Sequence, residues 1–165
     1  KLVDWTDRNT CILFGDGAGA VVLTGEENGR YNMTAHSDGR KGEALTCDTG
    51  SFMKMDGQEV FKFAVRQVPA CIAEVMEHNH LMAEDIDYFI LHQANRRIVE
   101  AVAKRMKVEL TKFPMNLQEY GNTSAASIPI LLDEWNRKGR LQKGDKLILA
   151  GFGAGLSWAG SLLEW

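Results

Sequence analysis

The sequence has no run of about 18 or more consecutive apolar residues, so no transmembrane helix is expected. It contains no CxxC motif, and its cysteines, Cys11, Cys47 and Cys71, are odd in number. These absences argue against a disulfide framework and for a reducing compartment, which we take to be the cytoplasm. The formal net charge is −3, so the chain as a whole has no attraction to nucleic acid, and an anionic partner would need a local basic patch.

The first residue is Lys1 rather than Met, and no charged-then-apolar leader follows it, so we expect the chain to begin within a longer protein. Its 165 residues, 45% hydrophobic and 25% charged, fit one globular domain with a real core. Apolar runs and alternation predict strands at 9–14, 21–24, 31–36, 44–47, 85–91, 146–150 and 156–163. Apolar residues at three- and four-residue steps predict helices at 58–79, at 94–107 and after Ser127. Strands and helices that alternate in this way indicate a layered α/β fold, and Pro69 predicts a kink or break in the first helix.

Three polar features lie where predicted elements begin or end. His92 follows a strand, Asn122 precedes a helix, and Gly151–Gly155 joins the last two strands. A histidine N–H, an asparagine amide and backbone N–H groups of a glycine-rich turn can together stabilise negative charge on a carbonyl oxygen. Taken singly, each feature is more often a structural histidine, a helix-capping asparagine or a tight turn. Only the combination indicates an active site.

The stretches LHQANRR at 91–97, YGNTSAASIP at 120–129 and GFGAG at 151–155 resemble the signatures of the β-ketoacyl-[acyl-carrier-protein] synthase III family. The stretches at 7–20 and 56–64 are similar to that family too, so the resemblance runs essentially end to end. It implies a thiolase-like α/β fold built from two similar halves. Residues 1–165 are then the C-terminal half, and the nucleophilic cysteine lies in an N-terminal half that the chain does not contain.

The resemblance implies an acyltransferase that initiates type II fatty-acid biosynthesis. The family moves a short acyl group, such as acetyl, from acyl-CoA to its cysteine and condenses it with malonyl-acyl-carrier protein, with loss of carbon dioxide. His92 and Asn122 match the catalytic residues that hydrogen-bond the malonyl thioester oxygen. Phe152 matches a residue that shapes the decarboxylation pocket, and the N–H of Ala154 matches an oxyanion-hole donor.

The same resemblance implies the partners. Gly57 and Asn95 match contacts to the CoA or phosphopantetheine arm, which arrives with the substrates, so no separate cofactor and no metal are expected. A stripe of basic residues after His92 would attract an acidic carrier protein. The predicted carrier-binding residues are Lys62, Gln93, Ala94, Asn95, Arg96, Arg97, Lys104 and Arg105. We also expect a homodimer of the full-length enzyme and no contact with nucleic acid or membrane.

Several alternatives stay open. The chain could be a non-catalytic scaffold half, or it could belong to the related CoA-dependent polyketide-type or hydroxymethylglutaryl-CoA synthases. Three further readings fit poorly. The loop at 15–20 does not open a helix and lacks the phosphate-binding pattern GxxxxGK(S/T), and the segment around Ser157 lacks the second glycine of a nucleophile elbow. His78, His80 and Cys71 lack the ligand spacing of a zinc site. Cys11 and Cys71 read as small core residues, which leaves Cys47, in a loop, as the one plausible reactive thiol of this chain.

Overall fold

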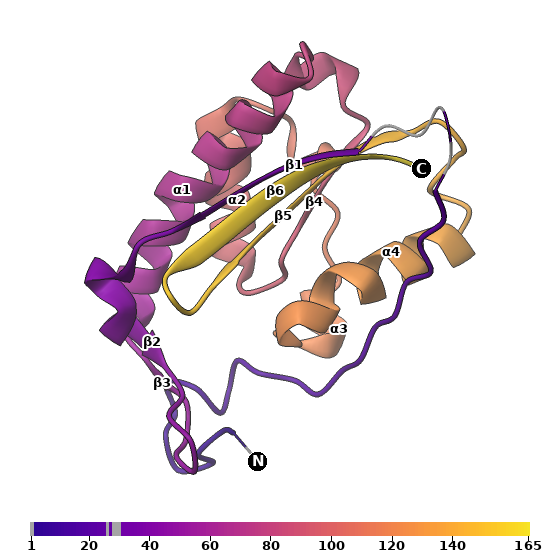
Figure 1. Cartoon of the computed structure of the whole chain (residues 1–165). Helices are drawn as coiled ribbons and strands as arrows, with labels where there is room; N and C mark the ends of the chain where they lie inside the picture. The colour runs from indigo at the N-terminus through magenta and orange to yellow at the C-terminus, as the bar shows by residue number, and fades with distance from the viewer. Residues whose placement is uncertain (1, 26, 28–30) are drawn as a thin grey trace.

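The computed structural model describes residues 2–25, 27 and 31–165 (Figure 1). Its main sheet has the order β1-β6-β5-β4, in which β4 and β5 are parallel and the other pairs are antiparallel. The strands of this sheet are β1 (Tyr31–Ser37), β4 (Tyr88–Leu91), β5 (Lys146–Gly153) and β6 (Ser157–Glu164). A separate antiparallel pair consists of β2 (Leu45–Thr46) and β3 (Lys54–Met55). The helices are α1 (Gly57–His78), α2 (Arg96–Met106), α3 (Leu117–Tyr120) and α4 (Ser127–Arg137), and 3-10 turns span Gly39–Ala44, Ala83–Asp85, Leu110–Lys112 and Ser124–Ala126.

Helices cover both faces of the main sheet, and the alternation along β4 explains why (Figure 1). Phe89 and Leu91 point to the face that carries α1 and α2, and Ile90 points to the opposite face, where Leu131 of α4 packs. Successive side chains of a strand point to opposite faces, so a strand buried on both sides reads as a continuous apolar run. The predicted α/β layering is therefore confirmed.

The helix α1 agrees with its prediction to within one residue at each end. The side chain of Asp56 caps its N-terminus by accepting hydrogen bonds from the N–H groups of Gln58 and Glu59. Val68, Ile72 and Val75 are buried against the sheet. Pro69 lies inside the helix and does not end it, so the predicted break is absent.

Two predicted strands are wrong. Residues 9–13 form turns, because Asp7 accepts hydrogen bonds from the backbone N–H groups that follow it. Its side chain accepts the N–H of Asn9, and its carbonyl oxygen accepts those of Thr10 and Cys11. Residues 21–24 form no strand either, although the segment is apolar. Val22 is 93% exposed and Leu23 is 84% exposed, and neither pairs with a strand in the described part of the chain. A strand needs a hydrogen-bonded neighbour, and this segment has none there.

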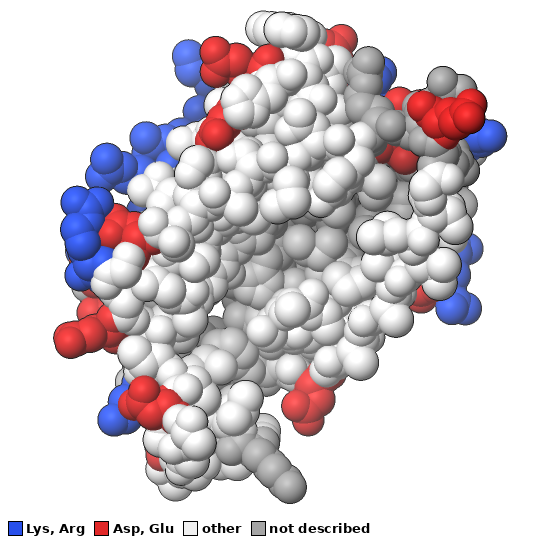
Figure 2. All heavy atoms as spheres, viewed as in Figure 1, with Lys and Arg blue, Asp and Glu red and all other residues white. Residues whose placement is uncertain are grey.

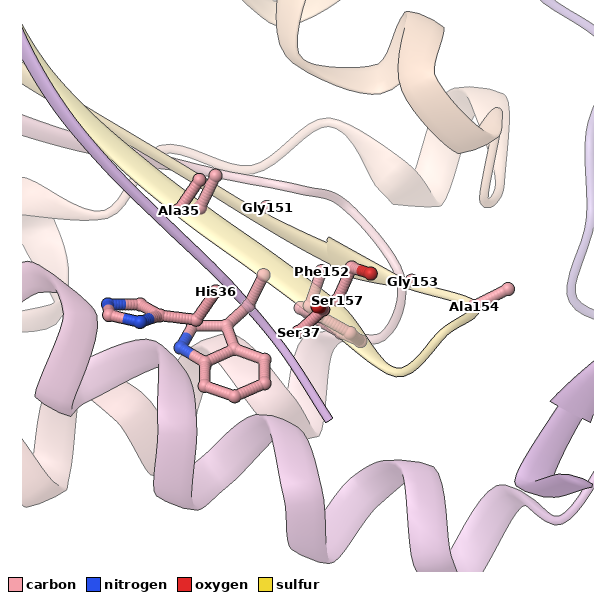
Figure 3. A pocket seen from close by; sticks show the side chains of 10 residues that line it. Ala35, His36, Ser37, Gly151, Phe152, Gly153, Ala154 and Ser157 are labelled. Atoms are coloured by element: carbon pink, nitrogen blue, oxygen red, sulfur yellow. The ribbon is translucent and has the colours of Figure 1, made fainter. Parts of the chain in front are cut away.

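One face of the sheet is only partly covered. The helix α4 packs against β4 and β5, and the hollow beside it, about 550 Å³ in volume, lies over β1 and the hairpin of β5 and β6. Figure 2 shows the surface deeply hollowed at the middle of this view. Small residues, among them Ala35, Gly151 and Ala159, line the hollow. On the other face, His36 points toward α1, where it contacts Glu74 (Figure 3), and Trp158 packs against Phe63 of the same helix.

Candidate active site

His92 lies immediately after β4, at the carboxyl end of two parallel strands. Its N–H donates to the carbonyl oxygen of Ala150 on β5 over 2.8 Å, which extends the strand pairing by one residue. Its ring stands edge-on to that of Phe152, with centroids 5.4 Å apart. Nδ1 lies 2.7 Å from the hydroxyl of Ser127, and Nε2 has no hydrogen-bond partner among the described residues. The free ring nitrogen is therefore available to a ligand.

Burial lowers the pKa of His92 to about 4, from an ordinary value of 6.5, because the charged ring would lose its hydration. The imidazole is neutral at pH 7 and presents a hydrogen-bond donor without a formal charge. In the unfolded chain the same ring takes up its proton near pH 6.5, so protonation favours unfolding between pH 6.5 and 4.

We therefore expect the free energy of unfolding to lose a contribution from His92 as the pH falls from 6.5 toward 4. An NMR titration of the His92 ring, assigned by comparison with the His92→Gln variant, should give a midpoint close to 4. A midpoint at the ordinary value would show that the ring is hydrated and would contradict the buried geometry.

Asn122 is brought to the same place by the turn before α4. Its N–H donates to the carbonyl oxygen of Leu13 and its carbonyl accepts from the N–H of Gly15, each over 2.9 Å, which forms a parallel bridge between Phe14 and Asn122. The side-chain oxygen accepts the N–H of Ser124 over 2.9 Å. The amide oxygen of Asn122 thus already accepts a hydrogen bond, whereas its NH₂ has no hydrogen-bond partner among the described residues and can donate to a ligand.

Gly15 allows the two backbone segments of this bridge to approach closely because it has no side chain. A Cβ at this position would lie 2.0 Å from the carbonyl oxygen of Tyr120. Gly15→Ala should lower the free energy of unfolding by about 1–3 kcal/mol, the usual cost of overpacking. Chemical denaturation of the whole protein measures this change. Gly25→Ala is the matched control, since a Cβ there meets nothing within 4 Å, and equal effects of the two changes would refute the close approach.

A cavity of about 240 Å³ joins the two residues. It lies between the turn at 13–14, the β2–β3 pair, the start of α1 and the end of the β5–β6 hairpin. The residues predicted from the sequence that line it are His92, Asn122, Phe152, Ala154, Gly57, Asn95 and Ala94. The structure thus gathers seven residues from distant parts of the chain into one concave surface, although their individual roles stay predictions.

Ala154 stands at the tip of the β5–β6 hairpin (Figure 3). It is exposed, and its N–H takes part in none of the turn and loop hydrogen bonds of the described residues. Phe152, two residues earlier in β5, packs edge-on against Phe63 of α1, with centroids 6.2 Å apart. The hairpin therefore presents the free N–H of Ala154 close to the aromatic ring of Phe152.

The remaining predicted residues lie outside the cavity, and one of them needs correction. Lys62, Arg96, Arg97, Lys104 and Arg105 are exposed on α1 and α2. Gln93 is only 1% exposed. Its amide donates to the carbonyl oxygen of Leu91 over 2.7 Å and accepts the N–H of Asn116 over 3.3 Å. A side chain held in this way is unavailable to a docking partner, so the prediction that Gln93 binds the carrier is wrong and its role is structural.

Sequence reasoning missed several members of the site. Ser127, which contacts His92, read only as the start of a helix. Phe14, Met55 and Phe61 line the cavity, but nothing in the local pattern distinguishes them from ordinary apolar residues. Their positions follow from the packing of the turn at 13–14, β3 and α1 around the end of β4.

The three cysteines differ in their surroundings. Cys71 is buried against the sheet, and burial raises the pKa of its thiol to about 11, so it is an inert core residue. Cys11 lies in a turn and not in the predicted strand. Cys47 is exposed in the loop after β2 and lines the cavity. None of the three occupies the first turn of a helix, where a thiolate would be stabilised.

No helix among the described residues is long and apolar enough to cross a bilayer. No group of three or more His, Cys, Asp or Glu side chains in the same residues is arranged to hold a metal ion.

Residues 76–165 match a family model described as 3-oxoacyl-[acyl-carrier-protein] synthase III C terminal. Residues 1–39 match a second model, described as 3-oxoacyl-[acyl-carrier-protein] synthase III. The chain belongs to the 3-oxoacyl-[acyl-carrier-protein] synthase III family. Its fold is accordingly thiolase-like, as the resemblance implied.

Individual members of the synthase III family agree with this assignment. The chain is 49% identical to the β-ketoacyl-[acyl-carrier-protein] synthase III of Clostridium tetani, and the match covers 100% of the chain and 56% of that protein. The crystal structure of the synthase III of Aquifex aeolicus superposes with a TM-score of 0.95 at 42% identity and covers 99% of the chain. The Thermus thermophilus enzyme superposes with a TM-score of 0.89 at 36% identity. The chain spans 55–56% of the length of the curated synthase III relatives that it matches and 54% of the Aquifex chain.

Proposed function

We propose that this chain supplies the decarboxylation half of a synthase III active site. In the whole protein it would serve the condensation of a short acyl group from acyl-CoA with malonyl-acyl-carrier protein. The observation that carries this proposal is the pair of free donors, the His92 ring nitrogen and the Asn122 amide NH₂, on one cavity of about 240 Å³. Neither group has another use in the described part of the fold.

The chemistry that we propose is a charge-stabilised decarboxylation. The malonyl carboxylate leaves as carbon dioxide, and the electron pair of the broken C–C bond moves into an enolate whose negative charge rests on the thioester oxygen. His92 Nε2–H and the Asn122 amide donate to that oxygen. The enolate carbon then attacks the acyl thioester on the enzyme's cysteine, and the N–H of Ala154 would stabilise the resulting oxyanion until the thiolate departs.

We further propose that the chain is the C-terminal half of the enzyme. Val22, Leu23 and the hollow beside α4 leave apolar and small-residue surface open, as expected of a face that packs against another part of the same protein. The matched share of the relatives, 56%, agrees with such a half. The nucleophilic cysteine would come from the other half, in a reducing cytoplasm.

The experiment is a product analysis with the whole protein. With acetyl-CoA and malonyl-carrier protein it should give acetoacetyl-carrier protein and carbon dioxide, and malonyl-CoA should replace malonyl-carrier protein poorly. Preference for malonyl-CoA would favour the CoA-dependent polyketide-type alternative. If no substrate pair gives a product while the protein folds, the scaffold alternative replaces our proposal.

The basic residues of α2 are the proposed docking surface for the carrier. Lysine and arginine side chains gather along the edge on the side of α1 and α2 in Figure 2. The guanidinium of Arg97 lies 5.5 Å from the centroid of the Phe61 ring, and Phe61 lines the cavity. Arg97 thus sits at the rim of the site, whereas Arg96 is paired with Glu100 over 2.7 Å.

Arg97→Glu should raise the KM for malonyl-carrier protein about tenfold, which corresponds to about 1.4 kcal/mol. The change replaces attraction of an acidic carrier by repulsion. The KM for acetyl-CoA should change little. Arg140→Glu is the matched control, because Arg140 is exposed near the start of β5, at the far end of that strand from His92. Equal effects of Arg97→Glu on both substrates would contradict a carrier-specific surface.

A further inference from the structure

Ser127 is the buried polar residue in direct contact with the His92 ring. It is the first residue of α4 and is only 2% exposed. Its Oγ lies 2.7 Å from His92 Nδ1 and 3.2 Å from the backbone N of Gln93. One hydroxyl thus meets both the catalytic ring and the backbone of the next residue.

The two contacts restrict where the hydroxyl proton can lie. The N–H of Gln93 can only donate, so Oγ accepts that bond. The remaining neighbour, His92 Nδ1, is the sole acceptor within hydrogen-bond distance of Oγ among the described residues. If Nδ1 carried the ring proton, Oγ would accept two N–H groups and its own proton would be buried without a partner. A buried hydroxyl proton without an acceptor lowers the free energy of unfolding by about 1–3 kcal/mol.

The backbone that fixes this arrangement is itself held on both sides. The Gln93 side chain donates to the carbonyl oxygens of Leu91 and Pro114 and accepts from Asn116, so the peptide before it cannot turn freely. On the other side, α4 is anchored by Leu131, which is fully buried against β4. The Gln93 N–H and the Ser127 hydroxyl are therefore fixed relative to the ring.

We propose that Ser127 is a positioning residue that donates its hydroxyl proton to His92 Nδ1 and so keeps the ring proton on Nε2. This tautomer places an N–H on the nitrogen left free for the cavity, where Asn122 supplies the second donor. With the opposite tautomer, Nε2 would present a lone pair to the enolate oxygen and repel it. The catalytic consequence rests on the proposed function, whereas the tautomer itself does not.

The test combines ¹⁵N NMR of the His92 ring with kinetics of the whole protein at neutral pH. In the wild type, Nδ1 should give the signal of an unprotonated nitrogen and Nε2 that of a protonated one. Ser127→Ala should mix the two tautomers and lower malonyl decarboxylation about 10- to 100-fold, the loss that follows removal of a residue that orients a metal-ligating histidine in the same way. The KM for acetyl-CoA should not change. Ser127→Thr, which keeps the hydroxyl, should restore the wild-type signals.

The outcomes separate this proposal from the proposed function. Protonated Nδ1 in the wild type, or an unchanged tautomer in Ser127→Ala, overturns the positioning role. If the tautomer shifts as expected but neither Ser127→Ala nor His92→Ala alters decarboxylation, the positioning role stands and the proposed function fails. Amide NMR spectra identify a misfolded variant, in which case Ser127→Cys and Ser127→Thr decide by the same ring signals.

Discussion

Asn122→Asp in the whole protein should lower the rate of malonyl decarboxylation by about 10²–10³-fold, the loss that follows removal of one oxyanion donor. The aspartate keeps an oxygen that accepts the N–H of Ser124, the bond that Asn122 makes over 2.9 Å. It loses only the NH₂ that faces the cavity, and it adds a negative charge beside the enolate. The measurement is release of carbon dioxide from malonyl-carrier protein.

His92→Ala should give a loss of similar size, about 10²–10³-fold, because it removes the other donor. His78→Ala is the matched control, since His78 is exposed at the end of α1 and does not line the cavity. The acyl transfer from acetyl-CoA to the enzyme should persist in the His92 variant. Decarboxylation at the wild-type rate in both His92→Ala and Asn122→Asp would refute the assignment of the site.

The second large effect concerns the chain by itself. The 165-residue chain should yield no condensation product, because its cavity holds the donors but no thiol in the first turn of a helix. We also expect it to self-associate, because Val22 and Leu23 are almost fully exposed and the hollow beside α4 is uncovered. Product analysis and sedimentation velocity measure the two properties.

The control for this prediction is the whole protein, which should be active in the same assay and should not self-associate through this surface. Val22→Lys should reduce self-association of the chain, because a charge on an exposed extended segment opposes pairing. Condensation by the chain alone that disappears in Cys47→Ser would show that Cys47, which lines the cavity, is the nucleophile. That result would contradict our division of the site between two halves.

The helices and strands were predictable wherever they are stabilised by their own residues or by packing against another element of this chain. The helix α1 has a capping aspartate and an apolar stripe, and β4 is a short apolar run buried on both faces. The strand expected at 21–24 failed for a physical reason, since apolar β-branched residues favour an extended backbone but do not provide a partner strand. The strand at 9–14 failed because Asp7 satisfies the backbone N–H groups of a turn.

The site was predictable only in part. The places of His92 and Asn122 at the ends of predicted elements indicated that they could belong to one site, and the family resemblance assigned their roles. The contact of Ser127 with His92 depends on how α4 packs against β4, which no local pattern contains. The burial of Gln93 was missed for the same reason, because a polar residue beside a basic stripe reads as exposed until its backbone partners are known.

The most direct test of the proposed roles of His92 and Asn122 is a crystal structure of the whole protein with a non-decarboxylating malonyl thioester analogue. We predict that the thioester oxygen lies about 2.7–3.1 Å from both His92 Nε2 and the Asn122 side-chain nitrogen, the distance at which such donors act. The analogue's pantetheine arm should leave the cavity between Asn95 and the rim at Arg97. A thioester oxygen bound away from both nitrogens, with the analogue at full occupancy, would contradict the proposal that His92 and Asn122 donate to it.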